Sequence, residues 1–257
     1  MSAPAVPSAR GAAPFAGARL AIAFLTVVPT GRVDGLGEAW LSRAAAWFPV
    51  VGALVGGVAA AVFVAAGAAG LSHGLAGALA IVATILFTRG LHEDGLADTA
   101  DGLGVHGSRE RRLAAMKDSA VGAHGALAMA CALLVCALAL ATLDRAHAAR
   151  AVVAAQVASR AAMVVAAAAL PNARVGEGLG RGLVVAPVAA FSATSLGVAT
   201  LVVAGDLVAL AAGAAALLVA VVIQARAFGG RTGDTLGATG KVVETVVLVA
   251  LSGAWSS

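Results

Sequence analysis

Long apolar runs are the feature that most limits what this chain can fold into. Runs of Ala, Val, Leu and Gly, each about as long as a membrane-crossing helix, recur from residue 45 to the C-terminus. Hydrophobic residues make up 61% of the 257 residues, charged residues 12%, and the mean hydropathy is +0.97. A water-soluble fold cannot bury so much apolar surface. The sequence therefore predicts an all-α, polytopic membrane helical bundle with about six or seven transmembrane helices.

The apolar runs and their breaks predict one membrane domain. Residues 15–28 are apolar but short, carry Arg19 and end at Pro29, which favours an interfacial or re-entrant helix. We expect residues 1–14 to be a disordered cytoplasmic tail and residues 15–257 a single integral membrane catalytic domain. The last expected span is short and would cross only with tilt or local thinning of the bilayer. The expected spans are 45–67, 75–91, 121–143, 149–170, 188–204, 207–225 and 242–254.

The positive charges predict an orientation in the bilayer. The net charge is +4, from 17 Lys and Arg against 13 Asp and Glu, and these cations lie beside apolar runs. That pattern is typical of positive-inside loops and not of a nucleic-acid partner, so the expected partner is the lipid bilayer. Alternation of the spans puts the tail and residues 92–119, 172–181 and 228–240 on one side. Because this side holds most Arg and Lys, we expect a multi-pass protein of the cytoplasmic (inner) membrane whose active site faces the cytoplasm.

The densest polar motif follows the second apolar run, at residues 92–102. Asp94, Asp98 and Asp101 are spaced i, i+4 and i+7, so a helix would carry all three on one face. Carboxylates so close repel each other unless a hard cation such as Mg²⁺ or Mn²⁺ binds them. A solvated acidic face is the alternative. His92 is either a group that orients a ligand or a polar residue at the membrane interface.

Two further groups of polar residues could carry chemistry. Lys117 and His124 flank the start of the third span, where cations could bind phosphate, although positive-inside loops have the same composition. Arg160 lies near the middle of the fourth span. An unpaired arginine there would cost several kcal/mol, so it should face a polar cavity or a carboxylate, and a structural ion pair is the alternative.

The last motif is the glycine-rich segment 229–238. Glycines let backbone approach a ligand, and Asp234 could add a carboxylate opposite the first cluster. Glycines serve equally well in tight helix packing, but that would leave Asp234 and Glu244 unexplained.

Taken together, these motifs resemble the cobalamin synthase family, the adenosylcobinamide-GDP ribazoletransferases. They occur in the order typical of the family, and the resemblance covers about residues 15–251. The resemblance implies a late step of vitamin B12 biosynthesis, nucleotide loop assembly, in which α-ribazole or its 5′-phosphate replaces GMP on adenosylcobinamide-GDP. The product would be adenosylcobalamin or its 5′-phosphate, and the cofactor Mg²⁺. The matching residues are 92–102, Met116 to Ser119 with Gly122 and His124, Ser159 and Arg160, and 230–238 with Glu244.

The resemblance also suggests residue roles. We expect Asp94, Asp98 and Asp101 to hold the metal ion, with Asp234 as a further ligand. Glu244 is the candidate acceptor of the hydroxyl proton. The expected substrate contacts are His92, Lys117, His124, Arg160, Arg231 and Asp234. A homo-oligomer, or association with other cobalamin-assembly enzymes, stays open.

Two other functions compete with this interpretation. A CDP-alcohol phosphotransferase also sets spaced aspartates over a nucleotide pyrophosphate, but it places an Ala-Arg pair where this chain has Asp98 and Thr99. A cation transporter would use the aspartates as an ion pathway. The position of the main acidic cluster at a membrane edge argues against that alternative.

Overall fold

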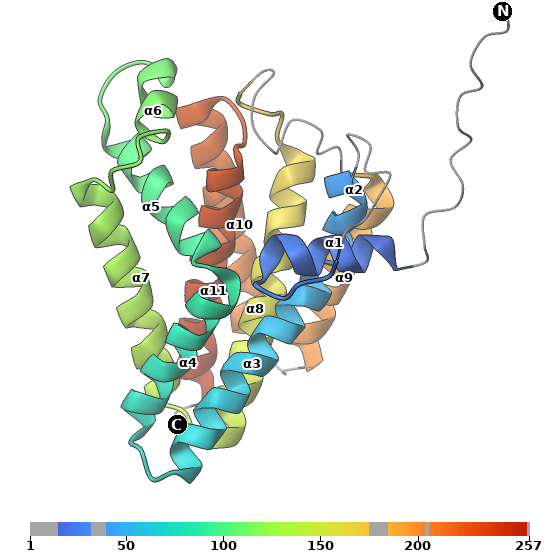
Figure 1. Cartoon of the computed structure of the whole chain (residues 1–257), viewed down its shortest axis with the longest axis vertical. Helices are drawn as coiled ribbons and strands as arrows, with labels where there is room; N and C mark the ends of the chain where they lie inside the picture. Colours follow the sequence, from blue (N-terminus) through green and yellow to red (C-terminus); the bar gives the residue numbers. More distant parts are fainter. Residues whose placement is uncertain (1–14, 32–39, 175–184, 204–205, 256–257) are drawn as a thin grey trace, which may run out of the picture.

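The computed structural model describes residues 15–31, 40–174, 185–203 and 206–255. All regular structure in these residues is helical, which confirms the predicted all-α class (Figure 1). The helices are α1 Ala16–Leu25, α2 Trp40–Ala45, α3 Phe48–Ala68, α4 His73–Thr88, α5 Leu91–Gly104, α6 Arg109–Ala115, α7 Ala123–Ala141, α8 Arg145–Ala169, α9 Pro187–Val203, α10 Leu207–Phe228 and α11 Gly233–Trp255.

Five of the described helices are long and apolar enough to cross a membrane: α3, α7, α8, α10 and α11. The pair α4 and α5, bent by 90° at its break, is a sixth candidate. A polytopic membrane bundle is therefore confirmed, with five or six candidate spans. Helix α9 has 17 residues and is shorter than these spans. The expected short span 242–254 is instead part of the 23-residue helix α11.

Helix α8 forms the centre of the bundle and is buried along most of its length. Helix α3 packs closely on it because Gly52 and Gly56 present no side chain. A Cβ atom on Gly56 would lie 2.6 Å from the Cα of Val153. Small residues at such crossings are the usual way for membrane helices to approach each other. Helix α10 lies on the outside and exposes apolar side chains such as Leu218, as expected of a helix that faces lipid.

A sharp turn at Arg89 and Gly90 separates α4 from α5. Both residues have positive φ values, 58° and 65°, and Arg89 is the one non-glycine residue in the described ranges with this backbone conformation. The left-handed region costs an ordinary residue roughly 1–2 kcal/mol. Its guanidinium donates hydrogen bonds to the carbonyls of Ala23 and Thr26, each at 3.2 Å, which helps to hold the turn. The turn directs α5 across the bundle instead of along α4.

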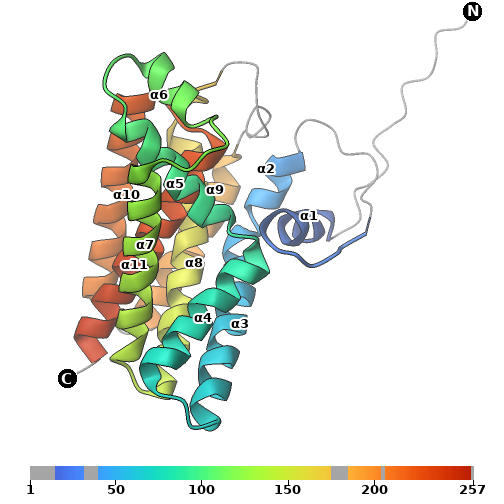
Figure 2. The ribbon, with the colours of Figure 1, turned by 60° about the vertical axis from the view of Figure 1, so that its left-hand side comes forward.

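The bundle has a polar end, defined here as α6, the segment 170–174 and the turn 229–232 (Figures 1 and 2). Asn172 forms an isolated bridge with Arg231, and Arg109 Nη2 donates to the carbonyl of Ala173 at 2.7 Å. At the opposite end, Arg145 donates to the carbonyl of Gly67. The described parts of 92–119, 172–181 and 228–240 thus meet at one end, as the alternation of spans predicted.

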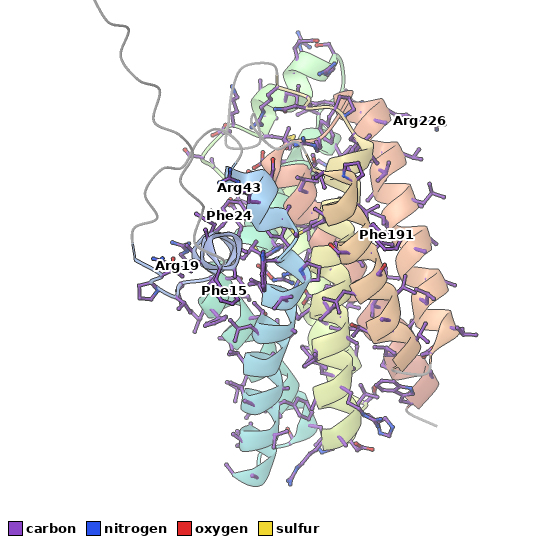
Figure 3. All side chains as sticks on the ribbon, turned by 90° about the vertical axis from the view of Figure 1, so that its right-hand side faces the viewer. Phe15, Arg19, Phe24, Arg43, Phe191 and Arg226 are labelled. Atoms are coloured by element: carbon purple, nitrogen blue, oxygen red, sulfur yellow. The ribbon has the colours of Figure 1, made fainter. Side chains whose placement is uncertain are left out.

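Helix α1 crosses the bundle instead of running parallel to it, and Figure 3 views it end-on. It has 10 residues, too few to span a bilayer, in agreement with the predicted interfacial or re-entrant helix. Phe15 at its start is exposed. The predicted tail, residues 1–14, lies outside the described residues, so its disorder and the domain boundary stay predictions.

Candidate active site at the polar end of the bundle

Helix α5 carries the predicted aspartates and lies against the first turn of α11. The contact is close because Gly95 faces α11: a Cβ atom there would lie 2.6 Å from the carbonyl oxygen of Asp234. Gly237 of α11 lies opposite Gly95 with more room, since a Cβ atom on Gly237 would lie 3.6 Å from the Cα of Gly95. Asp94 is exposed and Asp98 half-buried. The crossing brings these two carboxylates near Asp234, so the last glycine-rich motif faces the first acidic one.

Negative charge is in excess around Asp98. The carboxylates of Asp94, Asp234 and Asp101 all repel it, and Arg174 is the cation that opposes them. Arg174 Nη1 lies 3.4 Å from Asp234 Oδ2, and the Thr232 hydroxyl donates to the same oxygen at 3.3 Å. Among the described residues, no three His, Cys, Asp or Glu side chains are grouped closely enough to hold a metal ion by themselves.

Asp101 has a different setting from Asp94 and Asp98. Its Oδ2 accepts a hydrogen bond from the amide of Gly122 at 2.7 Å, and its Oδ1 from the amide of Gly125 at 2.9 Å. These amides begin α7, where unpaired N–H groups and the helix dipole attract a carboxylate. The helical spacing was predicted correctly, but the α7 amides hold Asp101, so the described residues do not form the expected three-carboxylate group.

A second set of charges is buried where α5, α8 and α11 meet, and we call it the buried ion cluster: Glu93, Arg160, Lys241 and Glu244. Lys241 Nζ lies 2.9 Å from Glu244 Oε1 and 3.1 Å from Glu93 Oε1. Glu244 Oε2 lies 4.0 Å from Arg160 Nη1. Arg160 therefore faces a carboxylate, as its position in an apolar helix required. Two cations and two carboxylates balance each other.

Polar neighbours complete this cluster. Arg160 donates to the side chain of Gln156 and, at 3.2 Å, to the Ser159 hydroxyl. His92 Nδ1 lies 3.5 Å from Arg160 Nη2. His92 and Glu244 were expected to contact substrate and to accept a proton, respectively. The structure places both side chains in the interior, in contact with the cations of the buried ion cluster.

The other predicted substrate contacts are spread over the polar end. Arg231 Nε donates to the carbonyls of Ala167 and Leu170 at 3.0 and 3.1 Å, and so caps the end of α8. Burial lowers the pKa of Arg231. Lys117 and His124 are exposed. The His124 ring lies against α5, where a Cβ atom on Gly104 would be 2.8 Å from its Cγ.

The sequence interpretation gave no specific role to two residues near the site, Arg174 and Glu93. Arg174 was counted among the cations of a polar loop, and its pairing with Asp234 depends on where that loop folds. Glu93 lies off the helix face of Asp94 and Asp98, so the spacing does not indicate it as a ligand. The signal that could have found it is that Arg160 and Lys241 are two cations in or beside apolar runs, and Glu244 alone cannot balance both.

Comparison with known proteins identifies the family. A family model described as cobalamin-5-phosphate synthase matches residues 17–252. Proteins named adenosylcobinamide-GDP ribazoletransferase are similar along nearly their whole length. That of Mesorhizobium japonicum is 41% identical over 93% of both chains, and that of Desulforamulus reducens 40% identical over 91% of this chain and 95% of its own. No solved structure matches. The resemblance seen in the motifs is thereby confirmed, and the chain belongs to the cobalamin-5-phosphate synthase family.

Proposed function

We propose that this protein is an adenosylcobinamide-GDP ribazoletransferase. It would join α-ribazole, or its 5′-phosphate, to adenosylcobinamide-GDP and release GMP. Relatives of that name cover more than nine tenths of the chain. The structural observation that carries the proposal is the approach of Asp94 and Asp98 on α5 to Asp234 on α11, with Arg174 beside them. An excess of carboxylates with one guanidinium suits a metal-bound pyrophosphate.

The reaction needs little from the protein except positioning and charge neutralisation. A ribose hydroxyl of the ribazole attacks the phosphorus linked to cobinamide, and the bond from that phosphorus to the oxygen of GMP breaks, so a 5′-phosphate on the ribazole passes unchanged into the product. A hydroxyl nucleophile gives its proton to an acceptor, and GMP leaves with the bonding electron pair. Phosphoryl transfer of this kind depends on holding the two reactants in line and on neutralising the charge of the leaving group.

Asp94, Asp98 and Asp234 fit the requirements of Mg²⁺. This ion keeps several water ligands and commonly binds one or two protein carboxylates together with substrate phosphates, so a closed three-residue group is not needed. When bound, Mg²⁺ would neutralise pyrophosphate charge. We assign Asp94 and Asp98 as the main ligands and Asp234 as a further one. Asp101 holds α7 beside them.

Arg174 is the best candidate for a phosphate contact. Its guanidinium lies between Asp234 and the carbonyl of Leu113, at 3.4 and 3.5 Å, and both contacts are long for such a strong donor. Its planar donors match phosphate oxygens in pairs. Lys117 and His124 are proposed as weaker contacts because they are exposed. Arg231 supports this region through its capping of α8.

We also propose that the polar end faces the cytoplasm. The support is the number of cations there, following the positive-inside rule. Glu244 was expected to accept the hydroxyl proton. Because it is buried against Lys241 and Arg160, we propose instead that it stabilises the buried ion cluster. Among the described residues, the cations at the polar end are Arg109, Arg111, Arg112, Arg174 and Arg231, and Lys117 follows α6 by two residues.

A reconstituted assay tests the function directly. The purified protein in detergent or liposomes, given Mg²⁺, adenosylcobinamide-GDP and α-ribazole, is expected to release GMP and form a cobalamin in equal amounts. EDTA should stop the reaction, and Mg²⁺ should restore it. CDP-alcohol substrates should give no CMP. Cation flux through liposomes without turnover would contradict the proposal and favour a transporter.

A further inference from the structure

Helices α5 and α11 each carry one part of the candidate site and one part of the buried ion cluster. On α5, Glu93 directly precedes Asp94. On α11, Lys241 follows Asp234 by seven residues, which is about two helical turns and the same side of the helix. Glu93 and Lys241 are joined by the 3.1 Å ion pair. The distance between the proposed metal ligands therefore depends on the same two helices that this ion pair connects.

We propose that the Glu93–Lys241 pair is a clamp that fixes how α5 sits on α11, so that both are positioning residues for Asp94, Asp98 and Asp234. This inference rests on the proposed function. Neither side chain need touch substrate. Their effect reaches the site through the backbone of the two helices.

Glycines lie at the closest point of the crossing between α5 and α11. Gly95 and Gly237 meet at the contact point and present no side chains that could interlock. Glycine contacts allow close approach, but a smooth surface resists sliding or rotation poorly. An ion pair in a buried, low-dielectric setting has a preferred distance and direction. The ion pair therefore fixes the register between α5 and α11, which the glycine contacts do not fix.

The third helix makes the clamp stiff. Glu244 holds Lys241 from one turn further along α11, and Arg160 of α8 holds Glu244. On the other side, Glu93 Oε1 lies 3.1 Å from Lys241 Nζ, while no residue in the described ranges gives Glu93 Oε2 a hydrogen-bond partner. Loss of either charge leaves the buried ion cluster with one net charge in the interior.

Direct metal binding tests the clamp separately from turnover. Mn²⁺ serves as the probe, and its binding to the detergent-purified protein is followed by electron paramagnetic resonance. Glu93→Gln and Lys241→Gln are each expected to weaken binding about 10- to 100-fold, the loss typical when a group that orients metal ligands is removed. The Mg²⁺ concentration that half-saturates GMP release should rise in parallel.

Three variants separate positioning from general destabilisation. Leu248→Ala removes a buried side chain of α11 outside the clamp, so it should lower the thermal unfolding temperature yet leave the Mn²⁺ affinity within about twofold of wild type. Glu93→Asp keeps the charge but withdraws the carboxylate by one methylene, and should still weaken Mn²⁺ binding. The double variant Glu93→Gln/Lys241→Gln restores charge balance and a hydrogen-bonding pair, and should bind better than the sum of the single losses predicts.

The outcomes distinguish the two proposals. Wild-type Mn²⁺ affinity in both single variants, beside an active wild-type enzyme, would overturn the clamp and leave the proposed function standing. Equal weakening in Leu248→Ala would overturn it as well. A wild-type protein that neither binds Mn²⁺ nor releases GMP would overturn the proposed function and the clamp with it.

Discussion

The two charged regions of this protein differ in balance. In the buried ion cluster, two cations face two carboxylates at distances between 2.9 and 4.0 Å. At the candidate active site, Arg174 is the cation that the described residues place beside Asp94, Asp98 and Asp234. A balanced set in a low-dielectric interior is complete without a ligand, whereas like charges held together at a surface favour a cation from solution. This difference assigns the buried ion cluster to the stability of the fold and the carboxylates of the candidate active site to ligand binding and reaction.

The largest effect is expected at the unbalanced region. Asp94→Asn or Asp98→Asn removes a proposed metal ligand and should lower the rate of GMP release by about 100- to 1,000-fold, the scale seen when one group that stabilises transition-state charge is lost. The thermal unfolding temperature should stay the same or rise, because carboxylate repulsion falls. Activity close to that of wild type, or a lower unfolding temperature in these variants, would contradict the role given to the unbalanced region.

The opposite pattern is expected in the balanced region. Arg160→Leu leaves Glu244 with Lys241 alone and should destabilise the fold by about 3–5 kcal/mol, the cost of breaking a buried charge set on one side. The change should be visible as a lower unfolding temperature in detergent. Val164→Ala on the same helix is a matched control that removes buried volume without removing charge. A similar loss in both variants would mean that the arginine's charge contributes little.

A smaller effect is expected for Arg174, which belongs to the unbalanced region but carries the opposite sign. Arg174→Ala should raise KM for adenosylcobinamide-GDP about 10-fold, since a charge-assisted hydrogen bond contributes roughly 1.5–3 kcal/mol. Arg174→Lys should recover only part of this, because lysine lacks the paired donors. Steady-state kinetics would show it. An unchanged KM with altered stability would make Arg174 a partner of Asp234 alone.

Variants of Asp101 test whether this residue has a structural role or a role in metal binding. As a cap of α7 it should contribute about 1 kcal/mol, so Asp101→Ala should lower the unfolding temperature modestly. Asp101→Asn keeps an oxygen acceptor for the α7 amides and should stay close to wild type in stability and within about tenfold in turnover. If Asp101→Asn loses as much activity as Asp94→Asn, Asp101 is a metal ligand as well as a cap.

The sequence predicted features that depend on one residue and its immediate surroundings. Arg160 in an apolar helix required a carboxylate, and the structure supplies Glu244. Which carboxylate it would be, and that Lys241 and Glu93 would join it, depends on how three helices meet. Spacing along a helix gave the shared face of Asp94 and Asp101, but it could not show that the amides of α7 compete for one of them.

Hydropathy alone also misjudged two helix boundaries. The apolar run predicts a span over residues 75–91, but α4 ends at Thr88, and Arg89 and Gly90 turn the chain by 90° into α5. Helix α11 begins at Gly233, earlier than the apolar run suggested, because Thr235, Thr239 and Lys241 are polar residues turned towards the interior. A polar helix face looks like a loop in the sequence when the partners that satisfy it are distant in the chain.

The neutrality of the buried ion cluster has a consequence for how this family can vary. A single substitution that changes the charge at position 93 or 241 leaves one net charge in the buried ion cluster, so such changes should persist only when both positions change together. Across an alignment of family members, position 93 should lose its acidic residue in those sequences whose position 241 loses its base. Substitutions at positions 93 and 241 would then occur together, whereas the conservation of the exposed aspartates would depend only on their role in the reaction.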